Sequence, residues 1–374
     1  MTEVEVSRTA VLRHRVGAHQ LGKASVTLPE CDVLGVGVRD NPVGATASLA
    51  LRTRRVDAEE ADTALVCAYS VRSALHVHRR SDVAQVRAAL RWSDGDEPAE
   101  QTYGPMVSRL GAADLDVQTT TASVVSAMVD VMSDGVPRTK SELSTDVTDR
   151  VSPAEAPWCP GCSAHHVDDA LFRHATLLAG LVAVAGSGRS FQLHILDEES
   201  TEPAPHAARS ALVRRYLHLA GAATPAQFAT WVGMRQPVVK RWWALLEDEV
   251  IPVRVDGTRM WALGTDVESL RAPASAAGGG LHLLPPYDPF TEIADRTQLV
   301  PTTEHRRRVW RAARNPGVVL RDGEVAGIWR DRRKGKARSV TIEPFAGLTA
   351  RQERSAAAAA ERLLGPAPVT VTFA

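Results

Sequence analysis

Residues 211–261 constrain the fold more than any other part of the sequence. Three helical patterns follow one another over 211–220, 224–233 and 236–249. The second begins with Thr224 and Pro225, an N-cap residue followed by a proline at the first helical position. Asp256-Gly257 then indicates a tight turn between two short strands. Three helices and a terminal hairpin predict a winged helix.

A second stretch has a similar order. Residues 106–150 contain one apolar helix face, formed by Val124, Val125, Met128, Val129 and Met132. A turn at 135–137 follows, and Thr139 then offers an N-cap ahead of an acidic residue. A helix, a glycine-containing turn and a second helix are typical of a helix-turn-helix.

The 374 residues exceed what one ordinary core needs, so we expect several domains. After residue 276 the patterns favour strands, with a hairpin signal at Asp322-Gly323 and one Arg/Ala-rich helix over 351–364. We therefore predict an α+β fold of four domains. They are an N-terminal winged-helix-like domain (1–104), a second winged-helix-like domain (105–205), a third winged-helix domain (206–275) and a β-rich C-terminal domain (276–374).

Two N-terminal stretches are candidates for function. Residues 34–42 form an apolar run that two glycines interrupt, and it ends in Arg39 and Asp40 before an Asn-Pro turn. Glycines allow a ligand to approach the backbone closely, so this is where we place any chemistry of the chain; the alternative is a short helix or strand that ends in a turn. Residues 72–80 alternate like a half-buried strand, with Arg72, His76 and His78 on one face. We expect that cationic face to contact DNA.

The sequence from His305 to Arg338 is strongly basic. It holds twelve Lys and Arg residues against three Asp and Glu, in a chain whose formal net charge is zero. Such a concentration favours an anionic partner, and next to winged helices we expect duplex DNA. Helical spacing predicts one face with Arg307, Arg311 and Arg314. A hairpin tip would present the predicted phosphate-binding residues Arg332, Arg333, Lys334 and Lys336.

Trp158-Cys159-Pro160-Gly161-Cys162, followed by His165 and His166, allows three interpretations. The two cysteines and one or both histidines can bind zinc, although the spacing is tighter than in usual fingers and no second Cys pair exists. A redox motif needs a preceding strand, which the pattern lacks. The third interpretation, a turn before a helix, leads us to expect no metal.

The composition excludes several classes of protein. Hydrophobic residues make up 44% and charged residues 24%, as in a soluble globular chain. The longest apolar stretch, 175–186, is far shorter than the ~20 residues of a membrane span. The acidic start carries no signal-peptide pattern. We expect a cytoplasmic monomer without a cofactor, since no phosphate loop or dinucleotide fingerprint is present.

The order of these motifs resembles that of the AlkZ-like winged-helix DNA-binding proteins, across nearly the whole chain. The matching segments are 36–42, 71–76, 212–233, 283–289, 316–320, 325–330 and 343–345. The resemblance implies tandem winged helices around a DNA channel and a β-rich C-terminal domain. It also implies a monofunctional DNA glycosylase that removes bulky N-alkylated purines, including crosslinked ones.

The catalytic signature of that family is Gln, an aliphatic residue, then Gln or Asp. The corresponding residues here are Gly37, Val38 and Arg39. Glycosidic cleavage builds oxocarbenium character, which a carboxylate can stabilise while it holds a water. One hypothesis is a glycosylase of altered substrate range that uses Asp40, with Asp288 from the Pro-rich turn, for this purpose. The other is a catalytically silent protein that binds DNA lesions or acts as a regulator.

Overall fold

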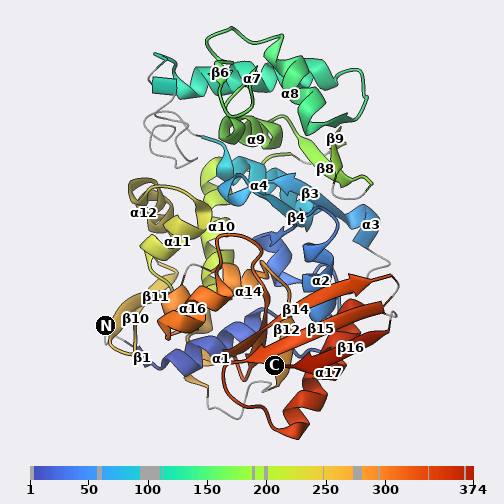
Figure 1. The fold of residues 1–374 in the computed structure, drawn as a ribbon. Coiled ribbons are helices and arrows are strands. Elements are labelled where there is room, and N and C mark those ends of the chain that lie inside the picture. The colour runs from blue at the N-terminus through green and yellow to red at the C-terminus, as the bar shows by residue number, and fades with distance from the viewer. Residues whose placement is uncertain are drawn as a thin grey trace.

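The computed structural model describes residues 4–56, 61–92, 110–111, 113–187, 190–197, 201–246, 248–272, 280–293, 295–335, 337–365 and 368–374. The chain has a mixed α+β fold in which three sheets and a small hairpin are joined by helices (Figure 1). No helix within these residues is both long enough and apolar enough to span a bilayer.

The predicted helix, helix, helix and hairpin of the third domain are present. They are α10 (Pro205–Ala220), α11 (Pro225–Val232), α12 (Gln236–Ala244), β10 (Val250–Val255) and β11 (Thr258–Leu263). Thr224 and Gln227 cap α11 reciprocally, as a capping box does. α12 ends at Ala244 and not at the predicted Glu249. Negative charges are unfavourable in the last turn of a helix, and Glu249 forms an ion pair with Arg214.

The N-terminal segment packs on this unit. β1 (Val4–Val6) extends the hairpin as a third strand, parallel to β10, and α1 (Arg8–Ala18) follows it. A short helix α13 (Val267–Arg271) packs beside α1. The predicted domains 1–104 and 206–275 therefore share a sheet.

A six-stranded sheet, in the order β2-β4-β3-β8-β9-β5, joins the first two predicted domains. From the first come β2 (Val38–Arg39), β3 (Leu65–Tyr69) and β4 (Leu75–Arg79), and from the second β5 (Arg138–Thr139), β8 (Leu181–Ala185) and β9 (Phe191–Ile195). The helices of this region are α2 (Thr46–Thr53), α3 (Ala61–Ala64), α4 (Val83–Leu90), α7 (Val117–Met132), α8 (Lys140–Thr148) and α9 (Asp169–Leu178). β6 (Trp158–Cys159) and β7 (Ala164–His165) form a separate hairpin between α8 and α9.

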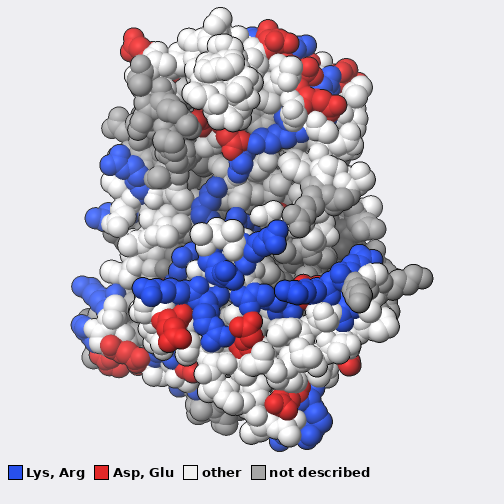
Figure 2. Space-filling view, in the orientation of Figure 1, with Lys and Arg blue, Asp and Glu red and all other residues white. Residues whose placement is uncertain are grey.

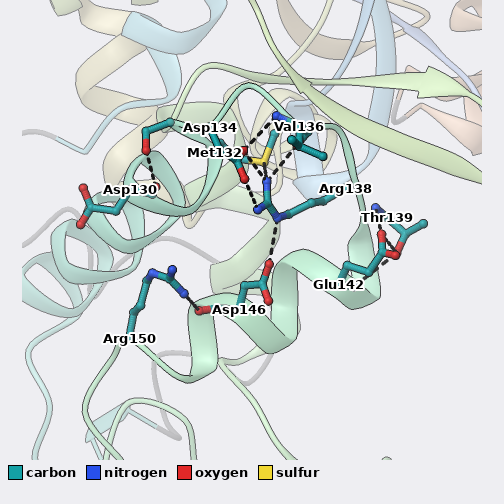
Figure 3. A network of polar contacts seen from close by, with 10 residues as sticks. Asp130, Met132, Asp134, Val136, Arg138, Thr139, Glu142, Asp146 and Arg150 are labelled. Carbon is teal, nitrogen blue, oxygen red and sulfur yellow. Dashed lines mark hydrogen bonds and ion pairs between the residues drawn. The ribbon is translucent and has the colours of Figure 1, made fainter.

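Polar contacts hold the α7–α8 turn. The Arg138 guanidinium donates to Asp134 Oδ2 (2.6 Å), to Asp146 Oδ2 (2.8 Å) and to the Val136 carbonyl (2.9 Å), as Figure 3 shows. The Arg138 hydrogen bond lowers the pKa of Asp134. Thr139 caps α8 as predicted and forms a capping box with Glu142. The predicted apolar face of α7 is buried at Val124, Met128 and Met132, whereas Val129 is half exposed.

The C-terminal part contains a five-stranded sheet, in the order β12-β13-β14-β15-β16. Its strands are β12 (Leu281–Leu284), β13 (Gly317–Arg321), β14 (Glu324–Lys334), β15 (Ala337–Pro344) and β16 (Val369–Phe373). The Asp322-Gly323 turn joins β13 to β14 as predicted. The helices of this part are α14 (Pro289–Glu292), α15 (Arg296–Leu299), α16 (Thr303–Val309) and α17 (Ala350–Leu364).

Two buried ion pairs connect the N-terminal and C-terminal parts. The Arg54 guanidinium donates to both carboxylate oxygens of Asp288, each at 2.8 Å, and both side chains are fully buried. Arg15 donates to Asp295 at 2.5 Å, and both of these side chains are also buried. The apolar core adds to this connection, since Leu12, Val16 and Leu21 share one buried cluster with Leu284 and Phe290 of the C-terminal part.

We predict that Arg54→Met destabilises the protein by about 3–5 kcal/mol, because it leaves the Asp288 carboxylate buried without its partner. Arg214→Met is the matched control, since the Arg214–Glu249 pair is roughly half exposed and should contribute less than about 1 kcal/mol. Urea unfolding of the two variants measures the difference. Equal losses would show that the buried pair has no special structural role.

Candidate functional site

A small pocket lies where the N-terminal, central and C-terminal parts of the chain meet. Its volume of about 10 Å³ has room for roughly one water molecule. The lining residues come from the stretch before and within β2, from η2 (Val71–Ser73), β4, α10 and α11, and from the turn into α14. They are Val36, Gly37, Arg39, Arg72, His76, Tyr216, Leu219, Trp231, Tyr287, Pro289, Glu292 and Ile293.

Gly37 can carry no side chain here. Its φ of +89° is in the left-handed region, and a Cβ would lie 2.4 Å from His78 Cε1. Val38 is fully buried in β2, and Arg39 extends into the pocket. Of the stretch 37–40 that the sequence singled out, Arg39 alone contributes a functional group to the pocket lining.

Two arginines and one carboxylate form the charged part of the pocket lining. Arg72 Nη2 donates to Glu292 Oε2 at 2.7 Å, and Arg39 Nη1 lies 3.4 Å from the same oxygen. The Arg39 guanidinium also stacks over the Tyr287 ring, 4.4 Å from its centroid. Both arginines contact Oε2 of Glu292. Its other carboxylate oxygen, Oε1, has no hydrogen-bond partner among the described residues.

The sequence interpretation missed Glu292. Its partners lie 220 and 253 residues away, so no local pattern marks it. Its position four residues after Asp288, in the short helix that Asp288 caps, is the only signal that the sequence offers.

Asp40 and Asp288 do not line the pocket, which corrects their predicted placement. Asp40 is 3% exposed, and it accepts hydrogen bonds from the backbone amides of Gly44 (2.5 Å) and Ala47 (3.0 Å) at the start of α2. Asp288 pairs with Arg54 and caps α14 through the Phe290 amide. Both carboxylates are occupied by structural hydrogen bonds, which favours a structural role for each.

The face of β4 that was predicted to be cationic points inward. His76 is 4% and His78 is 1% exposed, and both rings lie near the Ser70 hydroxyl, at 3.1 and 3.0 Å. Burial lowers the pKa of His76 well below its usual value and that of His78 to about 4, so both rings are neutral at pH 7. This corrects the prediction that they contact DNA, because neither offers a charged group to the surface. Arg72 is only partly exposed, in its pair with Glu292.

Figure 2 shows Lys and Arg side chains gathered in a band across the middle of one face, over α16 and the strands β14 and β15. We call the basic residues of α16, of the loop after it and of β14–β15 the basic band. Arg308, Arg330 and Arg338 pair with Glu343 or Asp331. Several exposed arginines have no acidic partner within the described residues, namely Arg307, Arg311, Arg314, Arg332 and Arg333.

The predicted helical face with Arg307, Arg311 and Arg314 is wrong in detail, because α16 ends at Val309. The Asn315 side chain accepts from the Arg311 amide, and Asn315 precedes Pro316, which disfavours helical backbone. Arg332 and Arg333 are exposed near the end of β14 as predicted. Lys334 ends that strand, and Lys336 lies outside the described residues.

The basic band and the pocket are connected by one stretch of chain. Glu292 ends α14, Arg296 begins α15, and α16 follows within the same twenty residues. The Arg296 guanidinium stacks over the ring of Trp310, just after α16, 5.2 Å from the ring centroid. Burial lowers the pKa of Arg72, and the positive charge of the nearby Arg296 lowers it further. A polyanion on the band would therefore pass close to the pocket.

Of the four predicted metal candidates, the structure brings three together. Ligand atoms of Cys159, Cys162 and His166 all lie within 4.8 Å of one another, whereas His165 is not in the group. His165 instead contacts the Ala156 carbonyl through Nδ1 and packs edge-on against Trp158.

Three comparisons with known proteins give consistent results. Residues 39–365 match the family described as DNA glycosylase AlkZ-like. The interstrand DNA cross-link repair glycosylase of Streptomyces sahachiroi is 32% identical over 133 residues, which are 34% of this chain and 35% of that protein. The solved structure of Streptomyces sahachiroi DNA glycosylase AlkZ superposes with a TM-score of 0.77 at 21% identity, covering 99% of this chain and 100% of that one. The alignable part of the curated relative is thus about a third of its length.

We predict that the free energy of unfolding decreases as the pH is lowered, because of the buried histidines. Folded His78 stays neutral to about pH 4, whereas its unfolded pKa is 6.5, so the unfolded state binds more protons in this range. The free energy of unfolding should fall by up to about 3 kcal/mol from His78 alone as the pH drops from 6.5 to 4. Thermal melts of wild type and His78→Gln across this range test the idea. A variant with an unchanged pH slope would refute it.

Proposed function

The chain belongs to the AlkZ-like DNA glycosylase family, and from this we propose that it binds duplex DNA along the basic band and cleaves the N-glycosidic bond of a bulky N-alkylated purine at the pocket. The observation that carries the proposal is the Glu292 carboxylate, which lines a pocket that fits one water and whose Oε1 has no hydrogen-bond partner among the described residues.

Winged helices are the proposed scaffold for binding. α10–α11–α12 with β10–β11, and α7–α8–α9 with β8–β9, each place three helices before an antiparallel pair of strands. That order is typical of winged helices. The unpaired arginines of the basic band would neutralise phosphates, and released counterions would drive a salt-dependent affinity.

The proposed chemistry assigns Glu292 the task of positioning water. Oε1 accepts a proton from a water, and the water oxygen forms a bond to the sugar carbon. The N-glycosidic bond breaks, and the purine leaves with its electron pair. The hydrogen bonds from Arg72 and Arg39 to Oε2 hold the carboxylate in one orientation. Glu292 would thus supply what Gly37 and Arg39 lack relative to the family signature.

A second candidate function is a catalytically silent protein that binds DNA lesions or acts as a regulator. The charge of the pocket favours it, since two guanidinium groups against one carboxylate leave net positive charge. Positive charge opposes a developing oxocarbenium ion and a cationic alkylated base.

We predict that Arg307→Ala with Arg332→Ala weakens binding to an undamaged duplex and lowers the salt slope of log K by up to about 1.8, or about 0.9 for each lost phosphate contact. The matched control removes two exposed arginines of α17, Arg351→Ala with Arg354→Ala, and should leave the slope unchanged. Fluorescence anisotropy across a salt series reports both. Equal losses in the two double variants would mean that the basic band is not the binding surface.

We predict that Glu292→Gln lowers the release of a bulky N-alkylated purine from duplex DNA by at least about 100-fold, because an amide cannot accept the proton of water. DNA affinity should stay within about twofold, and Glu304→Gln, an exposed carboxylate of α16, should keep full activity. Base release is measured by chromatography. A wild-type protein that binds duplex DNA but releases no base would leave the silent function standing.

A further inference from the structure

The hairpin β6–β7 lies between α8 and α9 at the end of the molecule away from the basic band, at the top of Figure 1. It carries a group of soft ligand atoms. The Sγ atoms of Cys159 and Cys162 and a ring nitrogen of His166 all lie within 4.8 Å of one another. Tetrahedral zinc holds sulfur and nitrogen ligands about 3–4 Å apart, so small side-chain rotations would complete the site.

His166 is oriented as a metal ligand. Its Nδ1 lies 2.6 Å from the Val167 carbonyl, and because a carbonyl only accepts, Nδ1 must carry the proton. Nε2 then presents a lone pair, and this buried atom has no hydrogen-bond partner among the residues that the structure describes. A histidine that donates through one nitrogen to a carbonyl and leaves the other free is the usual arrangement in metal sites.

Within the described residues, the hairpin has no buried apolar core of its own. Each strand has two residues, with Trp158 opposite His165 and Cys159 opposite Ala164. Trp158 is 53% exposed, and all of residues 160–165 are exposed. Two-stranded hairpins are marginal in water, and small units without a core commonly depend on a metal or a disulfide.

We propose that Cys159, Cys162 and His166 bind one Zn²⁺, with solvent in the fourth position. Two thiolates and an imidazole favour zinc over magnesium or calcium. The bound ion would fix the segment between α8 and α9, next to the ion pairs of Asp169 with Lys140 and Arg173.

The experiment measures metal in the full-length protein purified after growth with zinc sulfate. Elemental analysis should find one zinc per chain in wild type, and exchange for Co²⁺ should give thiolate-to-cobalt charge transfer and the visible bands of a tetrahedral ion. Cys159→Ser, Cys162→Ser and His166→Ala should each retain at least about tenfold less zinc. The neighbouring His165→Ala is the matched control and should retain it, because His165 is outside the ligand group.

Wild-type protein without bound zinc and without a tetrahedral cobalt spectrum would overturn the proposal, even if the variants do not fold. A mass two daltons lower than that of the reduced chain, without metal, would assign the cysteines to a disulfide and would also overturn it. Equal zinc loss from His165→Ala and His166→Ala would refute the ligand set. A chelator should lower the melting temperature of wild type and leave that of Cys159→Ser unchanged.

Discussion

The buried pair of Arg54 and Asp288 is the interaction on which the arrangement of the pocket depends. Arg54 follows α2, and Asp288 ends the Pro-rich turn that leads into α14. Since replacing one buried partner is costly and few alternative partners exist in an apolar interior, the pair fixes how these two distant segments meet. Glu292 is four residues beyond Asp288, so the same contact sets the position of its carboxylate against Arg39 and Arg72.

Much of the local structure could be predicted from the sequence, because its causes act over a few residues. Thr224 and Thr139 each cap a helix whose third residue returns the hydrogen bond. Asp256-Gly257 and Asp322-Gly323 both join paired strands, as such dipeptides do in tight turns. These signals place most of the helices and strands of 205–263 and 281–373, and the α+β class follows from them.

The pocket could not be predicted in the same way, because its chemistry comes from residues that meet only through the tertiary fold. The alternation in β4 was detected, but alternation gives two faces and does not say which is buried. The histidine face points inward, where the Ser70 hydroxyl lies within hydrogen-bond distance of both rings. Similarly, the basic composition of 305–338 is visible in the sequence, whereas the end of α16 at Val309 and the bond from the Arg311 amide to Asn315 appear only in the fold.

Arg39 and Glu292 are best understood as one unit. An arginine where the family signature has an amide or carboxylate would, alone, add a permanent cation to a site that develops positive charge. Glu292 places a negative charge beside the Arg39 guanidinium. Arg39 and Arg72 in turn hold the Glu292 carboxylate through Oε2. The balance therefore depends on where the reacting sugar would lie. Near Oε1 it meets a carboxylate oriented for water, whereas near the guanidinium groups it meets repulsion. The end of this small polar cluster that faces the sugar therefore decides between the two proposed functions, base release and binding of the lesion alone.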